Sequence, residues 1–437
     1  MKKILLFGSG RSAPVLIEYL SDLARKNFLS LTIADFSLSD ASLHEHIHTV
    51  AVHIDNELSR HRLIQDTDVV ISLLPPSLHS IIAHDCLLYR KHFLTASYIS
   101  PEIQQLDHAT REQGLLFLME CGLDPGIDHM SAMRELENIK ASGGTITSFK
   151  SYTGGLVAPE SDDNPWNYKI TWNPRNVVLA GQGTVKYLEG GAYKYIPYHR
   201  LFTTIEKIRV EGYGNFEGYA NRDSLKYLHT YGLENTSTLL RGTLRRPGYC
   251  DAWNLLVQLG ITDDSYIVEN SETLTWKEFT LSFLPKSDKK INLQLAALIN
   301  QGPGAREIAK LKWLGLLEDK KIGYPPATPA QLLQKLLEEK WRLQPEDKDM
   351  IVMQHLFEYT LNGKSHKRTS SLVMLGDNQI NTAMAKTVGL PLAIAARLIL
   401  EGKINLTGVH IPVMKEIYLP VLEELEKYDV RFINAEF

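Results

Sequence analysis

Short apolar runs alternate with helix-like stretches over the first 120 residues. The runs lie at residues 4–7, 31–34, 69–74, 93–96 and 115–119. Continuous apolar runs of this length are typical of strands that are buried on both faces of a sheet. The stretches 13–24 and 78–90 have helical spacing. Ser100 and Pro101 fit an N-cap and a first helical residue, and Gly114 fits a helix stop. Such alternation predicts an α/β fold, a Rossmann-type doubly wound parallel sheet.

The pattern changes after Gly126. Residues 145–152, 185–188 and 207–211 are rich in aromatic and β-branched side chains and are separated by glycine-containing turns, which predicts strands. Residues 292–359 have helical spacing, interrupted by prolines. A strand pair is expected over 357–375, and a C-terminal helix over 408–428. These elements predict a second, α+β domain with a helical insertion.

We therefore expect two domains. The first is a dinucleotide-binding domain over residues 1–125, and the segment 393–437 is expected to pack back on it. The second is a substrate and dimerisation domain over residues 126–392, with a helical subdomain at about 290–360. The length of 437 residues fits two or three domains.

Composition narrows the class of protein. With 44% hydrophobic and 22% charged residues the chain is an ordinary globular protein, and a net charge of -4 predicts no nucleic-acid partner. No run of about 18 apolar residues is evident, so we expect no membrane partner. The three cysteines form no CxxC pair, which argues against a structural metal and a disulfide framework. We expect a cytoplasmic protein without a metal, and the histidine-rich tract 44–48 is interpreted as a solvated helix or loop face between two strands.

A glycine turn at the N-terminus indicates a dinucleotide site. The segment Gly8-Ser9-Gly10-Arg11-Ser12-Ala13 fits G-x-G-x-x-G/A, follows an apolar run and opens a helix-like stretch. In this motif the first glycine makes the turn, the second admits the pyrophosphate, and the small third residue allows close helix packing. The phosphates then lie at a helix N-terminus.

Two further positions bear on the cofactor. Asp35 ends the second apolar run, where an acidic side chain binds the adenine ribose of NAD and repels the 2′-phosphate of NADP. It could instead only cap the following turn. Leu73 and Leu74 precede Pro75-Pro76, a turn expected beside the nicotinamide half of the cofactor or an ordinary strand-to-helix loop. The cofactor is therefore NADP or NAD, with Asp35 favouring NAD.

Four other stretches are rich in functional groups, namely 95–98, 121–129, 172–175, and 222–223 with 243–248. Any one of them alone could be a solvated loop. Behind a nucleotide fold, their arginines suggest a small-molecule substrate with several carboxylates, because arginine forms bidentate charge-assisted bonds with that group.

These stretches resemble saccharopine dehydrogenase of the glutamate-forming type. The resemblance extends over nearly the whole chain, and its most specific segments are Ser97-Tyr98, the run 122–129, the run 151–156, the run 172–180, Arg222-Asp223-Ser224 and Thr243-Leu244-Arg245. It implies NAD(P)-dependent interconversion of saccharopine, a tricarboxylate amino acid, with glutamate and 2-aminoadipate 6-semialdehyde through an imine.

The resemblance also implies roles for individual residues. Asp124 is expected as the first candidate for acid/base catalysis and Tyr98 as the second. The substrate-binding residues would be Ser97, Tyr98, Asp124, Arg222, Thr243, Leu244 and Arg245. The cofactor-binding residues would be Gly8, Ser9, Gly10, Arg11, Ser12, Asp35, Leu73, Leu74, Leu123, Asp124, Pro125, Gly126, Ile127 and Arg175.

The chain departs from similar fungal enzymes at two positions. Those enzymes carry a cysteine where this chain has Thr153, so no thiol can assist proton transfer here. They also use NADP, which Asp35 disfavours. Two alternatives stay open, a carboxynorspermidine synthase-like imine reductase with a diamine substrate, and a dinucleotide-binding sensor without turnover. A homodimer is expected through the sheet of the second domain, and the sequence does not give the physiological direction.

Overall fold

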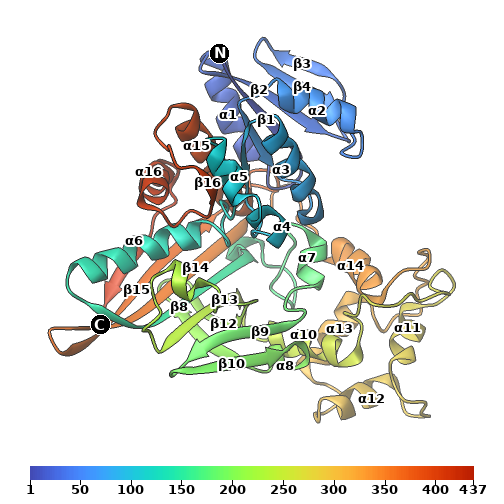
Figure 1. Ribbon diagram of the computed structural model, residues 1–437. Coiled ribbons are helices and arrows are strands. Elements are labelled where there is room, and N and C mark those ends of the chain that lie inside the picture. Colours follow the sequence, from blue (N-terminus) through green and yellow to red (C-terminus); the bar gives the residue numbers. More distant parts are fainter. The chain divides into compact units, whose positions relative to one another are not determined.

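The structure is a computed structural model that describes residues 1–437. The chain divides into two compact units (Figure 1). Unit 1 comprises Met1–Ile146, Tyr359–Ser365 and Leu372–Ala435. Unit 2 comprises Thr147–Glu358, His366–Ser371 and Glu436–Phe437. The segment after residue 125 up to Ile146 thus belongs to unit 1, and so does the segment Leu372–Ala435.

Unit 1 contains an eight-stranded sheet with the order β16-β7-β6-β5-β1-β2-β4-β3. Its strands are β1 (Lys2–Phe7), β2 (Leu29–Asp35), β3 (Ala41–His44), β4 (Ile47–Ala51), β5 (Val69–Ser72), β6 (His92–Thr95), β7 (Leu116–Leu118) and β16 (Gly408–His410). Every pairing is parallel except that of β3 with β4. The five predicted apolar runs are the strands β1, β2, β5, β6 and β7, which confirms the Rossmann-type sheet.

The helices of unit 1 are α1 (Pro14–Arg25), α2 (Glu57–Gln65), α3 (His79–Leu88), α4 (Pro101–Gln104), α5 (Asp107–Glu112), α6 (Ile127–Ala141), α15 (Ala383–Leu400) and α16 (Lys415–Leu425). Alternate strand residues such as Leu5, Val70 and Phe93 pack with Ile64 of α2 and Ile82 of α3 in one buried cluster. Alternate residues of a strand point to the same face of the sheet, so α2 and α3 cover one face of this sheet. The Ser100 cap is confirmed, because its side chain accepts a hydrogen bond from the backbone N–H of Ile103.

Helix α15 corrects one expectation from the sequence. Its 18 residues have a mean hydropathy of 1.6, so by length and composition alone it could cross a membrane, although no such run was expected. However, 78% of that window is buried inside the protein. The helix contacts α1, and Gly389 allows this approach, because an added Cβ would lie 3.0 Å from the Leu16 Cβ. Its apolar character therefore fits a core helix of unit 1.

Most of a second, mixed sheet belongs to unit 2. Its order is β10-β9-β13-β8-β14-β15-β17, with β12 beside β13 and β11 beside β12, and all of β17 but its last residue belongs to unit 1. The strands are β8 (Thr145–Val157), β9 (Thr184–Glu189), β10 (Ala192–Pro197), β11 (Ile205–Val210), β12 (Gly214–Ala220), β13 (Thr238–Arg245), β14 (Asp349–Leu361), β15 (Lys364–Leu375) and β17 (Ile433–Glu436). The predicted strands at 145–152, 185–188 and 207–211 are confirmed as parts of β8, β9 and β11.

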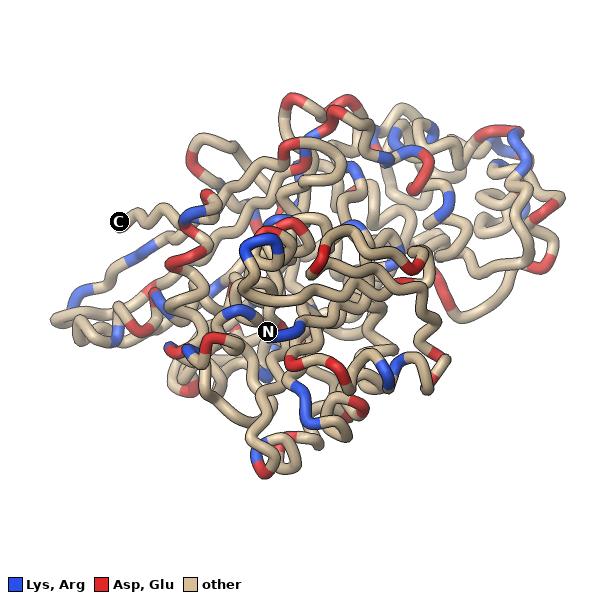
Figure 2. Tube along the Cα trace, turned by 90° about the horizontal axis from the view of Figure 1, so that it is seen from above, with Lys and Arg blue, Asp and Glu red and all other residues tan.

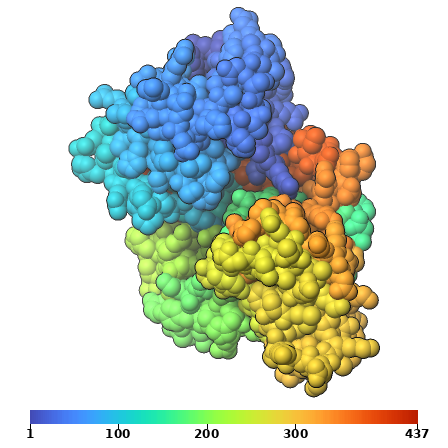
Figure 3. Space-filling model, turned by 90° about the vertical axis from the view of Figure 1, so that its right-hand side faces the viewer, coloured from blue at the N-terminus to red at the C-terminus, as the bar shows by residue number.

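The remaining helices are α7 (Pro174–Val178), α8 (Tyr198–Leu201), α9 (Tyr227–Thr230), α10 (Tyr249–Leu259), α11 (Trp276–Ser282), α12 (Ile291–Leu298), α13 (Arg306–Leu314) and α14 (Pro329–Lys340). Three short 3-10 helices complete the fold, η1 (Pro76–Leu78), η2 (Pro159–Ser161) and η3 (Glu426–Tyr428). Capping boxes at Thr275 and Thr328 fix the starts of α11 and α14. The segment from α11 to α14 forms a continuous yellow-to-orange region in Figure 3.

Three predicted elements differ from the structure. The helical stretch expected to reach residue 359 ends at Lys340, because Asp349–Leu361 is the strand β14, whose first seven residues are all buried. The C-terminal stretch 408–428 is not one helix, since Gly408–His410 is the edge strand β16 and α16 begins at Lys415. The tract 44–48, predicted as a solvated helix or loop face between two strands, contains the turn of the β3–β4 hairpin and the strand residues beside it, so it is not helical.

Candidate functional site

The carboxyl edge of the unit 1 sheet brings the predicted motifs of that unit together. Parallel strands end at the same edge, so the residues that follow β1, β2, β5, β6 and β7 are neighbours there. β1 lies between β2 and β5, and the order of the strands along the chain reverses at this position in the sheet. Ligands of open α/β sheets bind in the crevice outside such a switch point. The structure therefore places the glycine turn, Asp35, Leu73, Tyr98 and Asp124 at the edge where this fold binds nucleotides.

The glycine turn fits a dinucleotide. Gly8 has φ +98°, and a Cβ there would lie 3.0 Å from the carbonyl oxygen of Leu73, so glycine is required. Gly10 has no heavy atom within 4 Å of its Cβ position, so a side chain would occupy space open to a pyrophosphate. Ala13 is fully buried, and no side chain caps the start of α1. The backbone groups at this helix start can therefore receive phosphate oxygens.

Asp35 is held as a carboxylate beside this turn. Its Oδ2 accepts a hydrogen bond from the backbone N–H of Ser9 at 2.8 Å, and its Oδ1 accepts from the N–H of Ser37 at 2.9 Å. Burial alone would raise the pKa of Asp35, but the hydrogen bonds from Ser37 and Ser9 outweigh burial and hold the pKa below its ordinary value. Asp35 does cap the following turn, and it also fixes a negative charge where the adenine ribose of a Rossmann fold lies.

Tyr98 and Asp124 form a direct pair. Tyr98 follows β6, Asp124 follows β7, and the Tyr98 hydroxyl donates to Asp124 Oδ1 at 3.3 Å. Asp124 is the one residue between Cys121 and Met130 that is not buried. Its neighbours Leu123, Pro125, Gly126 and Ile127 are all buried. The fold thus presents a single carboxylate from an otherwise enclosed loop.

A buried network holds this loop in place. Glu120 Oε1 accepts from the N–H of Ile99 at 3.1 Å, and Glu120 Oε2 lies 2.9 Å from His129 Nε2. Asp128 Oδ1 accepts from the N–H of Gly126 at 2.6 Å. The side chains of Glu120 and His129 are fully buried. Because such groups are costly to bury without partners, their pairing ties the β6 and β7 loops to the start of α6.

Sequence reasoning missed a histidine beneath Ser97. His79 opens α3 with 3% of its surface exposed. Its Nε2 lies 2.7 Å from Ser97 Oγ, and its Nδ1 lies 2.9 Å from Ser72 Oγ. The position follows the Pro75-Pro76 turn, which was the one available signal. Glu120 and His129 were also missed as a pair, because nothing in sequence spacing reveals a contact across the loop.

The predicted substrate residues of unit 2 have different surroundings. Arg245 is 3% exposed, and its guanidinium lies 5.2 Å from the ring centroids of Tyr168 and Tyr249 and 5.8 Å from that of Tyr219. Its Nη1 donates to the Leu244 carbonyl, and its Nε has no hydrogen-bond partner. Arg245 is thus a buried cation within tyrosine rings, with one donor left for another acceptor.

The other predicted residues of unit 2 have more varied surroundings, and Thr243 lies opposite Tyr219 on the neighbouring strand β12. Arg222 is exposed and has φ +51°, while the adjacent Asp223 pairs with Lys186 at 3.3 Å. Thr243 pairs across the sheet with Thr153 of β8, whose buried hydroxyl has no hydrogen-bond partner. Arg175, a predicted cofactor residue, forms an ion pair with Asp264. Arg175 would have to exchange this partner, or share it, to meet a phosphate.

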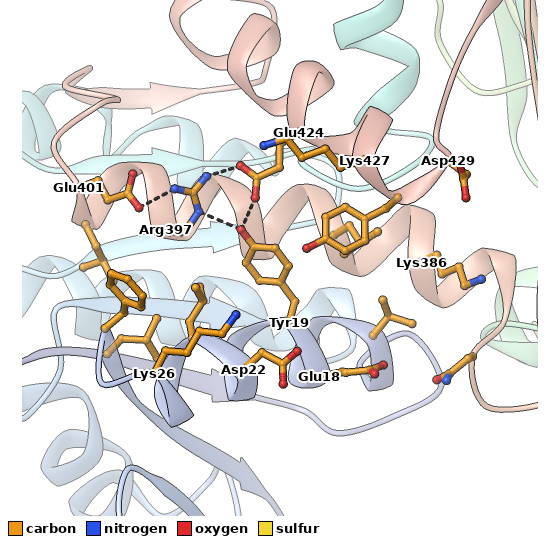
Figure 4. A pocket seen from close by; sticks show the side chains of 18 of the residues that line it. Glu18, Tyr19, Asp22, Lys26, Lys386, Arg397, Glu401, Glu424, Lys427 and Asp429 are labelled. Carbon is orange, nitrogen blue, oxygen red and sulfur yellow. Dashed lines mark hydrogen bonds and ion pairs between the residues drawn. The ribbon is translucent and has the colours of Figure 1, made fainter.

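A groove of about 790 Å³ lies at the opposite, amino-terminal edge of unit 1 (Figure 4). It is lined by residues of α1, α15 and α16 together with the starts of β1 and β2. Arg397 donates to the Tyr19 hydroxyl at 2.9 Å and forms ion pairs with Glu401 and Glu424. None of the predicted site residues lines this groove. Its central cation, Arg397, is already paired, so the groove is a packing junction of three helices rather than the predicted site.

The geometry defines a Rossmann-type dinucleotide-binding unit with a Tyr–Asp pair at its carboxyl edge. Comparison with known proteins is more specific. Residues 4–118 match the model of the saccharopine dehydrogenase NADP binding domain, and residues 122–430 match that of the saccharopine dehydrogenase C-terminal domain. The chain belongs to the saccharopine dehydrogenase family.

Individual relatives match along the whole chain. It is 36% identical to the mitochondrial alpha-aminoadipic semialdehyde synthase of Mus musculus over 99% of this chain, but over only 47% of that protein. The chain thus spans about half the length of its mammalian relatives. It is 33% identical to saccharopine dehydrogenase [NADP(+), L-glutamate-forming] of Saccharomyces cerevisiae over 98% of both chains. The solved apo structure of a saccharopine dehydrogenase (L-Glu forming) from that yeast aligns with a TM-score of 0.88, 31% identity and full coverage of both chains.

Proposed function

We propose that this chain is a saccharopine dehydrogenase of the glutamate-forming type. The observation that carries the proposal is the Tyr98–Asp124 pair at the carboxyl edge of the dinucleotide-binding sheet, in a chain of this family. Family membership supports the substrate, and the pair supplies a carboxylate with a hydroxyl partner at the place where the nicotinamide end of a cofactor binds. The products would be glutamate and 2-aminoadipate 6-semialdehyde, with water consumed.

The bound nicotinamide dinucleotide would supply hydride acceptance, which is chemistry that side chains cannot perform. The chain's own residues would orient the substrate and move protons. Asp124 would take the proton from the secondary amine of saccharopine as that nitrogen becomes an imine. After water adds to the imine carbon, Asp124 would return a proton to the departing glutamate nitrogen. Tyr98 donates to Asp124, so it would fix the carboxylate and is the second candidate for proton transfer.

Carboxylate recognition is assigned to the arginines. A tricarboxylate substrate requires cationic partners, and Arg222 and Arg245 are proposed for this role with Thr243 and Leu244 beside them. The unpartnered Nε of Arg245 supports it, because a buried donor without an acceptor is costly and would gain by meeting a carboxylate. Ser97 is proposed to contact the substrate.

We propose that NAD is preferred over NADP. The Asp35 carboxylate supports this preference, since its depressed pKa keeps it charged at neutral pH and a 2′-phosphate beside it would be repelled. Relatives in fungi are named for NADP(+). The Asp35→Ser variant should lower the NAD to NADP ratio of kcat/KM about tenfold or more, because like charges brought together cost several kcal/mol. An unchanged ratio would remove Asp35 from cofactor selection.

The carboxynorspermidine alternative differs in substrate charge. A diamine arm would need pocket carboxylates rather than arginines, and the unpartnered Nε of Arg245 favours the acid. Steady-state kinetics with saccharopine and with carboxynorspermidine, each with both dinucleotides and with glutamate identified as a product, tests the proposal. Turnover of saccharopine alone is expected. Turnover of carboxynorspermidine alone, or dinucleotide binding without any turnover, would contradict it.

A cytoplasmic location and a homodimer are proposed as well. The three cysteines are buried and unpaired, which supports a reducing compartment. Acidic and basic residues are interspersed along the trace (Figure 2), which fits a small-molecule enzyme better than a protein that binds a polyanion. Fractionation of cells and light scattering of the purified protein test the two statements. A membrane-bound fraction or a monomer would contradict them.

A further inference from the structure

His79 lies in a line of hydroxyl groups that ends at Ser97. The Ser72 hydroxyl is 2.9 Å from Nδ1 of the ring, and the Ser97 hydroxyl is 2.7 Å from Nε2. A third hydroxyl, that of Thr95, is 3.4 Å from the same Nε2. Ser72 and Thr95 end the neighbouring strands β5 and β6, so the ring lies beneath the carboxyl edge. Ser72, His79 and Thr95 are buried, whereas Ser97 is partly exposed.

The ring is neutral under ordinary conditions. Burial lowers the pKa of His79 to about 4, because a charged imidazolium would lose its hydration there. A neutral imidazole has one N–H donor and one lone pair on the other nitrogen. The ring therefore sets a direction along the line, since it donates on one side and accepts on the other.

The contacts at Nε2 decide between the two directions. Thr95 Oγ1 accepts from the backbone N–H of Ser97 at 3.3 Å, so its own hydrogen is available to the ring. The Ser97 hydroxyl approaches the same nitrogen at shorter range. A hydrogen on Nε2 could serve only one of these two oxygens well, whereas a lone pair there accepts from Ser97 and leaves the longer Thr95 contact favourable.

We infer that His79 is a positioning residue that carries its hydrogen on Nδ1, donates to Ser72, and accepts the Ser97 hydroxyl hydrogen at Nε2. The Ser97 oxygen then presents only lone pairs to the substrate. It accepts a hydrogen bond from an ammonium or amine N–H and offers nothing to a carboxylate. This inference rests on the proposed function, and it assigns Ser97 to an amino group of the substrate rather than to one of its acids.

Nitrogen NMR of the ligand-free protein tests the tautomer without any activity. The His79 ring signals are identified by their absence from the spectrum of His79→Gln. The inference expects a protonated Nδ1 and an unprotonated Nε2 near neutral pH. A hydrogen on Nε2, or a doubly protonated ring, would overturn it. Neither result depends on saccharopine being the substrate, so this measurement stands apart from the proposed function.

A double-mutant cycle with saccharopine tests the path through Ser97. Both Ser97→Ala and His79→Phe should lower kcat/KM about tenfold to hundredfold, the worth of a hydrogen bond to a charged group. The effect should fall mainly on KM, with dinucleotide affinity changed less than about twofold. In the Ser97→Ala background, His79→Phe should add less than about threefold.

The controls separate positioning from mere packing. His79→Gln keeps an amide oxygen that can accept from Ser97, so it should recover part of the loss and serves if His79→Phe does not fold. Two effects that multiply, or a Ser97→Ala enzyme with wild-type kcat/KM, would overturn the inference. If the wild-type protein does not turn over saccharopine at all, the proposed function fails instead, and the NMR result still decides the tautomer.

Discussion

Both edges of the unit 1 sheet carry polar side chains, but their polar side chains have different partners. At the amino-terminal edge, Arg397 is already paired with Tyr19, Glu401 and Glu424 (Figure 4). At the carboxyl edge, the buried Glu120 binds the backbone N–H of Ile99 and the buried His79 contacts the Ser97 hydroxyl. Asp124, by contrast, is partly exposed. The charged groove is therefore not the candidate active site. A partly exposed carboxylate on a loop that buried partners hold in place is a better indication of an active site.

The largest effect is expected at Asp124. Asp124→Asn removes the proposed acid/base group, so kcat with saccharopine should fall about 10²- to 10⁴-fold. Affinity for dinucleotide and thermal stability should change little, because the neighbouring loop is held by Glu120 and Asp128. Steady-state kinetics and dinucleotide titration measure the two. The matched control is Glu18→Gln, an exposed acid of the groove, which should leave kcat unchanged. An equal loss of kcat in both variants would contradict the claim that only the carboxyl edge takes part in catalysis.

The carboxyl edge should also respond to pH through His79. Its pKa is about 4 in the folded protein against 6.5 ordinarily. Below pH 6.5 the unfolded chain binds a proton that the folded chain does not, so this term lowers the free energy of unfolding as pH falls toward 4. At 1.36 kcal/mol per pKa unit, it amounts to about 3 kcal/mol at most.

Denaturant unfolding of wild type and His79→Gln between pH 7 and pH 4 isolates this contribution, since other titrating groups cancel in the difference. The wild type should lose more stability than the variant over this range. Parallel curves would show that the ring is not neutral in the folded state, and a steeper loss in His79→Gln would have the wrong sign.

A smaller effect, on stability alone, is expected at the groove. Arg397→Met leaves the partly buried Glu424 and Tyr19 without their cation and should lower the free energy of unfolding by about 2 kcal/mol, while kcat stays near normal. Thermal unfolding should show a Tm lower by several degrees. Lys403→Met breaks an exposed pair with Glu401 and should cost less than about 0.5 kcal/mol. A large loss of kcat in Arg397→Met would mean that the groove takes part in the chemistry.

The sequence predicted what local pattern determines. The strands β1 and β5 and the Gly8 turn follow from apolar runs and from a backbone that only glycine adopts easily. The Asp35 position followed from its place at the end of a strand, whereas the role of Asp124 was predicted from the resemblance alone. The strand β14 was mistaken for helix because its first seven residues are all buried, so no period-two alternation of polar and apolar residues marks it.

The surroundings of Arg245 and His79 could not be predicted from the sequence, because they depend on contacts between distant segments. Besides the nearby Tyr249, Arg245 is enclosed by Tyr168 and Tyr219, which come from distant segments, so its burial could not be foreseen from its own neighbours. His79 meets Ser97, which is 18 positions away, through the register of the parallel strands. Spacing along the chain encodes neither contact.

One isotope experiment tests the central claim most directly. Saccharopine with both hydrogens replaced by deuterium at the lysine-arm carbon next to the secondary amine is incubated with the protein and oxidised dinucleotide, and the product masses are measured by mass spectrometry. The account predicts one deuterium in the reduced dinucleotide and release of unlabelled glutamate. Unlabelled reduced dinucleotide, or the absence of glutamate, would contradict it.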